Sequence, residues 1–189
     1  MSASVLTRRE AAELGEISLG AINKAIEQRV IPVRRVHRRP MLSPESVASL
    51  VVLSDIDIPL PIKTKRQISQ WVVVLVERGV TKPEVLLLSE ALQVRYPSWA
   101  REVAQRARRY AELRDKLVEV NPEIRGGEPV IRGSRVPVRG LARQIELGEG
   151  IEALREDYPH LPKAAFEFAP MWAKANPRRG RPVPPWRNE

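Results

Sequence analysis

A glycine-rich segment at residues 126–138 constrains the fold of this chain more than any other feature. It reads Gly-Gly-Glu-Pro-Val-Ile-Arg-Gly-Ser-Arg-Val-Pro-Val, with two short apolar runs on either side of Gly133 and Ser134. Extended runs around such a pair predict a β-hairpin with a tight two-residue turn. A helix is expected to follow and to end at Gly148, because apolar residues recur at helical spacing at Val138, Leu141, Ala142 and Ile145.

The residues after Gly148 predict two more short helices. The first runs from Ile151 to Tyr158 and is stopped by Pro159, and the second is opened by Pro162. A hairpin followed by three short helices within about fifty residues is the outline of a small helix-turn-helix module.

The same region resembles a family of bacterial antitoxin domains. The matching residues, between Asn121 and Trp186, are Asn121-Pro122-Glu123-Ile124, the glycine-rich segment, Gly148 and Asp157-Tyr158-Pro159-x-Leu161. The family is VapB-like and is found mainly in type II toxin–antitoxin operons. Ser134 stands where the family usually has Thr, which keeps the hydroxyl. The resemblance implies an antitoxin that binds its own promoter and a partner toxin, and the toxins paired with this family resemble PIN-type ribonucleases.

The N-terminal residues predict a second helix-turn-helix. Thr7 and Glu10 have the spacing of a capping box, and Ser18 can cap a second helix three residues after the first one ends at Gly15. Leu19, Ile22 and Ile26 are expected to form the inner stripe of that second helix. Its outer face carries Asn23 and Lys24, whose side chains can reach base edges or phosphates, as can the capping residue Ser18 at its start.

An arginine-rich stretch follows this pair of helices. Residues 33–42 alternate apolar and basic side chains, and we expect them to turn at Pro40 and form a two-stranded wing that carries Arg34, Arg35, Arg38 and Arg39. Ser43 and Pro44 then open another helix. The order helix, turn, helix, basic wing looks like the winged helix-turn-helix domains of MerR-type regulators and phage excisionases. An ordinary helical domain with a solvated basic surface is the alternative.

The middle of the chain predicts a helical connector. Residues 55–61 are proline-rich and indicate a linker or edge strand, and residues 80–97 are ambiguous between helix and strand. One helix is expected from Thr64 to Arg78 and a longer one from Ser98 to about Val118. Their apolar stripes indicate core or a dimer interface, and we expect a homodimer that uses Trp71, Val72, Leu75 and Val76. Four arginines of the longer helix could track phosphates or form a solvated face: Arg106, Arg108, Arg109 and Arg114.

Basic residues of the C-terminal hairpin have two interpretations. Arg132, Arg135 and Arg139 could contact DNA phosphates, or they could brace acidic residues of the fold such as Glu152, Glu156 or Asp157.

The last fourteen residues, 176–189, are rich in proline, glycine and arginine, and we expect a disordered basic tail. Arg179-Gly180-Arg181-Pro182 has the core of an AT-hook, which binds the minor groove of A·T-rich DNA. The antitoxin resemblance instead implies that the tail folds onto the toxin. Its arginines would then meet the carboxylates of the ribonuclease site, and tryptophans would supply apolar contacts. The expected toxin-binding residues are Trp172, Arg178, Arg179, Arg181 and Trp186.

Charge and composition favour a polyanionic partner. The formal net charge is +9 over 189 residues, and there is no cysteine. The longest apolar runs are far below the ~20 residues needed to span a membrane, and we expect a cytoplasmic protein. The two histidines lie in different modules, so no metal site, catalytic pair or cofactor site is visible, and we expect no enzymatic activity.

Together these features predict a mainly α-helical chain with two small (winged) helix-turn-helix modules. The expected parts are a winged module at residues 1–54, a helical connector at 55–120, an antitoxin-family module at 121–175 and the basic tail at 176–189. The expected function is an antitoxin that neutralises a PIN-like ribonuclease toxin, forms a higher-order complex with it and represses its own operon by binding operator DNA. The alternative is a transcriptional or nucleoid-associated DNA-binding protein with an AT-hook-like tail and no toxin partner.

Overall fold

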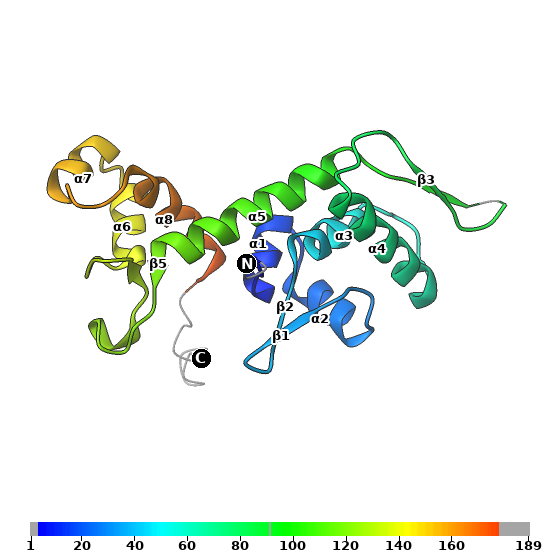
Figure 1. The fold of residues 1–189 in the computed structure, drawn as a ribbon, viewed down its shortest axis with the longest axis horizontal. Coiled ribbons are helices and arrows are strands. Elements are labelled where there is room, and N and C mark those ends of the chain that lie inside the picture. Colours follow the sequence, from blue (N-terminus) through cyan, green and yellow to red (C-terminus); the bar gives the residue numbers. More distant parts are fainter. Residues whose placement is uncertain (1–3, 91, 178–189) are drawn as a thin grey trace, which may run out of the picture.

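The computed structural model describes residues 4–90 and 92–177. The chain is mainly helical, at 55% helix, with a few short antiparallel hairpins, which confirms the expected fold class. A long central helix, α5 (Trp99–Leu117), crosses the molecule, with the C-terminal helices at one of its ends and the N-terminal half of the chain packed along the rest (Figure 1). None of the helices in the described ranges is long and apolar enough to cross a membrane.

The N-terminal half begins with the predicted helix, turn, helix and wing. These elements are α1 (Arg8–Gly15), α2 (Leu19–Glu27), the strands β1 (Arg34–Val36) and β2 (Arg39–Met41), and α3 (Pro44–Ser54). The capping box is present, because the Thr7 hydroxyl accepts from the Glu10 amide and the Glu10 carboxylate accepts from the Thr7 amide. The hydroxyls of Ser18 and Ser43 cap α2 and α3 by accepting from the amides of Ala21 and Ser46.

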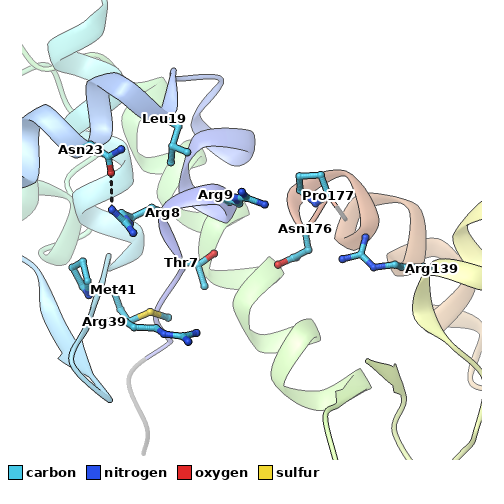
Figure 2. A pocket seen from close by; sticks show the side chains of 11 residues that line it. Thr7, Arg8, Arg9, Leu19, Asn23, Arg39, Met41, Arg139, Asn176 and Pro177 are labelled. Carbon is cyan, nitrogen blue, oxygen red and sulfur yellow. Dashed lines mark hydrogen bonds between the residues drawn. The ribbon is translucent and has the colours of Figure 1, made fainter. Parts of the chain in front are cut away.

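The inner stripe of α2 differs from the prediction at one position. Ile22 and Ala25 are buried and Ile26 is partly buried, but Leu19 is 38% exposed. Leu19 is the first residue of α2, where the helix has no preceding turn to pack against, and its side chain faces outward beside Asn23 (Figure 2).

The wing turns two residues earlier than expected. Val36 pairs with Arg39, so the turn residues are His37 and Arg38, with φ of 47° and 63°. Two consecutive positive φ values are the mark of a type I′ turn, whose twist matches that of the strands it joins. Pro40 lies within β2 opposite Arg35, a position that a two-stranded sheet tolerates because every strand is an edge.

The connector contains two helices and a hairpin. α4 (Ile62–Glu77) begins after Pro61 with no side-chain cap, so the expected start at Thr64 was wrong by two residues. The ambiguous segment forms the hairpin β3 (Val85–Leu87) and β4 (Gln93–Arg95), and residues 55–61 form a loop without a strand. The predicted inner stripe of α5 is buried at Val103, Ala107, Tyr110 and Leu117.

The apolar stripe of α4 is used inside the chain. Val72, Leu75 and Val76 are at most 7% exposed, in a helix packed on α3 and α5, and the Trp71 ring meets Tyr96 edge-on with centroids 6.1 Å apart. The expected dimer interface was therefore wrong at Val72, Leu75 and Val76, which one copy of the chain already covers, and the homodimer itself stays a prediction.

The C-terminal unit starts directly at the end of α5. β5 (Val118–Glu119) pairs with β6 (Val130–Ile131), and the 3-10 turn η1 (Arg125–Gly127) lies between them. The predicted hairpin is present as a bridge between Val130 and Pro137, with Gly133 in its turn at φ 73°. Its partner strand β5 was not anticipated. The three predicted helices follow as α6 (Val138–Glu146), α7 (Ile151–Asp157) and α8 (Lys163–Ala175).

One core joins the two halves. Buried apolar residues form a single cluster from Leu6 to Ala175, and α1 packs on both α5 and α8. The N-terminal module therefore sits in a fixed position against the helices of the C-terminal unit.

Candidate nucleic-acid interface

The exposed face of α2 carries the residues that were expected to read bases. Lys24 is exposed and Asn23 is half-buried beside Leu19. Arg8 of α1 donates from Nη1 to Oδ1 of Asn23 at 2.9 Å, which holds the amide in place through its oxygen. Ser18 is exposed, but its hydroxyl accepts from the Ala21 amide at 3.1 Å, so it serves first as the helix cap.

The wing places four guanidinium groups beside this face. Arg34, Arg35, Arg38 and Arg39 are all exposed on β1, β2 and their turn. Ser46 donates to the carbonyl of Pro32 at 3.0 Å and so ties the base of the wing to α3. The structure thus brings the predicted base-reading and phosphate-contacting residues of the first 54 residues onto adjoining elements.

A groove lies next to these elements, between the two halves of the chain (Figure 2). Its volume is about 580 Å³. One wall comes from α1, α2 and β2, and the other from α6 and the residues after α8. The lining residues are Thr7, Arg8, Arg9, Leu19, Asn23, Arg39, Pro40, Met41, Arg139, Asn176 and Pro177.

The other predicted DNA contacts are placed differently. Arg132 donates to the carbonyls of Asp115, Lys116 and Val118, so it satisfies the C-terminal end of α5 rather than an acidic side chain. Arg135 is exposed in the same hairpin. Neither residue lines the groove.

Most of the arginines named on α5 brace the N-terminal half of the chain. Arg106 donates to the carbonyl of Leu14, and Arg108 pairs with Glu45 of α3. Arg114 pairs with the buried carboxylate of Glu10 at 2.8 Å. Arg109 is an exposed side chain on α5. Of these four arginines, it is the one for which both predictions, a phosphate contact or a solvated face, stay open.

The expected toxin contact at Trp172 needs correction. Trp172 is 5% exposed, and the guanidinium of Arg139 stacks 5.0 Å from its ring centroid, so the indole belongs to the core of this chain. The sequence missed this because an indole on an amphipathic helix suits a core and an interface equally. Arg178, Arg179, Arg181 and Trp186 lie outside the described residues.

The hydrogen bonds behind the groove fix how its two walls are held together. Asn176 donates to the hydroxyl of Tyr110 at 3.0 Å, and that hydroxyl donates to Glu10 at 3.2 Å. Burial, followed by the negative charge of Glu10, raises the pKa of Tyr110 far above its ordinary value. Lys174 of α8 pairs with Glu13 of α1 at 2.6 Å, and this hydrogen bond raises the pKa of the lysine.

Several groove residues were not among the predicted contacts. Arg9 lies opposite the buried Ala11 and Leu14 on α1, and Arg8 is exposed next to it, so a helical projection of the capping-box helix is the signal that could have found them. No such signal exists for Asn176, because its bond to Tyr110 joins residues 66 positions apart in the chain. Within the described ranges, no three His, Asp or Glu side chains are placed to hold a metal ion.

One of the comparisons with known proteins, the family match, agrees with the division of the chain at the end of α5. No solved structure matches it. A protein of Sinorhizobium fredii (strain NBRC 101917 / NGR234) described as "Uncharacterized protein y4eO" is 27% identical over 196 residues, which cover 95% of this chain and 85% of that protein. Residues 118–173, the C-terminal unit from β5 through most of α8, match the family described as "Protein of unknown function (DUF433)".

Proposed function

We propose that this chain is a DNA-binding repressor that reads operator DNA in the promoter of its own operon with α2 and its wing. The observation that carries this proposal is the Arg8–Asn23 hydrogen bond on the exposed face of α2, next to a wing with four exposed arginines. An asparagine held in this way can bond an adenine edge in the major groove, and wing arginines can bond the phosphates on either side.

The test separates base reading from phosphate contact in the full-length chain. Asn23→Ala should weaken binding to the segment upstream of its own coding sequence by about 1–3 kcal/mol and leave binding to a random duplex unchanged. Arg35→Ala should weaken binding to both duplexes and flatten the salt dependence. Fluorescence anisotropy measures both. Equal losses on the two duplexes for Asn23→Ala would remove α2 as the reading element.

We further propose that the repressor is the antitoxin of a type II pair and neutralises a PIN-like ribonuclease in the cytoplasm, as the resemblance at residues 121–186 implies. A second, more apolar groove between α6 and α8 supports a protein contact there. Its lining combines Ala142, Leu147, Pro170 and Met171 with three basic groups, at Arg139, Arg143 and Lys174, and one acidic group at Glu146. Leu147 is 71% exposed, which suits an apolar contact with an acidic partner.

Co-expression with the neighbouring open reading frame tests this role. The full chain should restore growth, and a chain cut after Pro177 should fail to do so while still binding the promoter. Leu147→Ser should weaken the neutralisation, and Leu87→Ser, an equally exposed leucine on β3, is its control. A neighbour without toxicity, or a truncated chain that neutralises as well as the full chain, would favour the alternative of a transcriptional or nucleoid-associated DNA-binding protein with an AT-hook-like tail.

A further inference from the structure

The groove between the two halves of the chain is a cationic site made by elements far apart in sequence. Of its lining residues four are arginines, and none is acidic. Arg8 and Arg9 come from α1 and Arg39 from β2, whereas Arg139 comes from α6 in the region that matches the uncharacterised family. In Figure 2 the side chain of Arg9 extends toward the wall formed by Asn176 and Arg139.

This concentration of charge indicates the chemistry of the occupant. Guanidinium groups bind phosphate through charge-assisted, often bidentate hydrogen bonds. Asn23 and Leu19 of the α2 face also line the groove. An anion bound in the groove would therefore lie beside the base pairs that α2 contacts. The sugar-phosphate backbone of the same duplex runs beside those base pairs, so the anion can be one of its phosphates.

The far wall is held rigidly, so the groove exists before any ligand binds. Arg139 stacks on the buried ring of Trp172, and α8 is tied to α1 by the 2.6 Å ion pair between Lys174 and Glu13. Asn176, at the end of α8, is bonded through Tyr110 to Glu10 of α1. A site with fixed walls loses little conformational entropy on binding.

We propose that Arg139 and the groove bind the phosphodiester backbone of DNA beside the segment read by α2, so that the C-terminal unit takes part directly in DNA binding. This inference rests on the proposed function, because it needs α2 to face the duplex. It assigns to α6 a sequence-independent contact that lengthens the footprint on one side.

Salt dependence measures this contact. Arg139→Gln should reduce the slope of log K against log salt concentration by about 0.9, the value for one lost phosphate contact on duplex DNA. It should lower affinity by the same factor for the promoter segment and for a random duplex, and shorten the hydroxyl-radical footprint on one side. Arg155→Gln removes an exposed arginine of α7 that does not line the groove, and should leave slope and footprint unchanged.

Two further variants separate phosphate binding from support of the fold. Arg139→Lys keeps the charge and should keep the slope. If Arg139→Gln lowers the melting temperature through the lost contact with Trp172, Arg9→Gln on the opposite wall is used and should reduce the slope by the same amount. Wild-type slope and footprint in well-folded Arg139→Gln and Arg9→Gln would overturn the inference while leaving promoter reading by α2 intact. A wild-type chain that binds neither duplex would overturn both.

Discussion

Arg114 of α5 and Glu10 of α1 form an ion pair with 2.8 Å between Nη1 and Oε2, and the Glu10 side chain is only 2% exposed. The same Glu10 carboxylate accepts from the Thr7 amide and from the Tyr110 hydroxyl. One residue therefore completes the cap of the first helix and fastens that helix to the central one. Because α1 carries Arg8, which positions Asn23, this pair also bears on the proposed DNA-reading face.

Removing the arginine from this pair should be costly. Arg114→Ala leaves a buried carboxylate without its counter-charge, and we expect the free energy of unfolding to fall by about 3 kcal/mol. Arg109→Ala, an exposed position on the same helix, should change it by less than about 0.5 kcal/mol. Urea unfolding followed by circular dichroism compares the two. Similar values for both variants would show that the pair adds nothing to stability.

Tyr110 should make the fold sensitive to alkali. Burial and the nearby Glu10 charge raise its pKa in the folded chain, so the unfolded chain loses the phenolic proton first, from about pH 10. The stability that depends on protonated Tyr110 is thus complete below that pH and is lost as the pH rises toward the folded-state pKa. Tyr110→Phe should be less stable than wild type by about 1 kcal/mol at pH 8, and the gap should shrink above pH 10. Parallel curves from pH 8 to 12 would contradict this.

Replacing Tyr96 by phenylalanine should stabilise the fold, whereas the same replacement at Tyr110 should destabilise it. Its hydroxyl is buried and has no hydrogen-bond partner in the described part of the chain. Tyr96→Phe removes a polar group that is buried without a bond, so we expect the free energy of unfolding to rise by up to about 1 kcal/mol. Thermal unfolding of Tyr96→Phe beside Tyr110→Phe is the matched comparison. Destabilisation by Tyr96→Phe would mean that the hydroxyl has a partner.

The turn of the wing should lower the stability of the fold and, through its arginine, strengthen DNA binding. His37 and Arg38 both have positive φ, which Asn and Gly adopt with less strain. The double change His37→Asn, Arg38→Gly should therefore stabilise the fold slightly. It should also weaken binding to any duplex, because a wing arginine is lost. Melting temperature and anisotropy on a random duplex test the two halves of this expectation. An increase in affinity would show that Arg38 does not face the DNA.

The place of truncation should matter for the fold. Asn176 donates to Tyr110 and to the carbonyl of Trp172, so it belongs to the folded unit rather than to the predicted tail. A chain cut after Ala175 should be about 1 kcal/mol less stable than a chain cut after Pro177, which keeps both Asn176 bonds. Asn176→Ala in the full chain should reproduce the first result. Equal melting of both truncated chains would show that the Asn176 bonds do not contribute.

Local chemistry was sufficient to predict most of the elements. The capping box at Thr7 and Glu10 and the Ser18 and Ser43 caps follow from residues three positions apart, and the arginine wing follows from the alternation of residues 33–42. The buried stripe of α5 follows from helical periodicity for the same reason. Where local signals were weak, as at residues 80–97, the sequence left helix and strand undecided and the structure formed a hairpin.

Tertiary packing decided what the same residues do. The stripe of α4 is suited equally to a dimer or to an intramolecular core, and only its packing on α3 and α5 made it core. Trp172 became a buried partner of Arg139, and most of the arginines named on α5 became braces for the N-terminal half, because groups far apart in the sequence lie within contact distance. The cationic groove exists only because α1, β2, α6 and the end of α8 converge. Sequence patterns report the face of one element at a time, whereas a site between elements depends on how their faces are packed together.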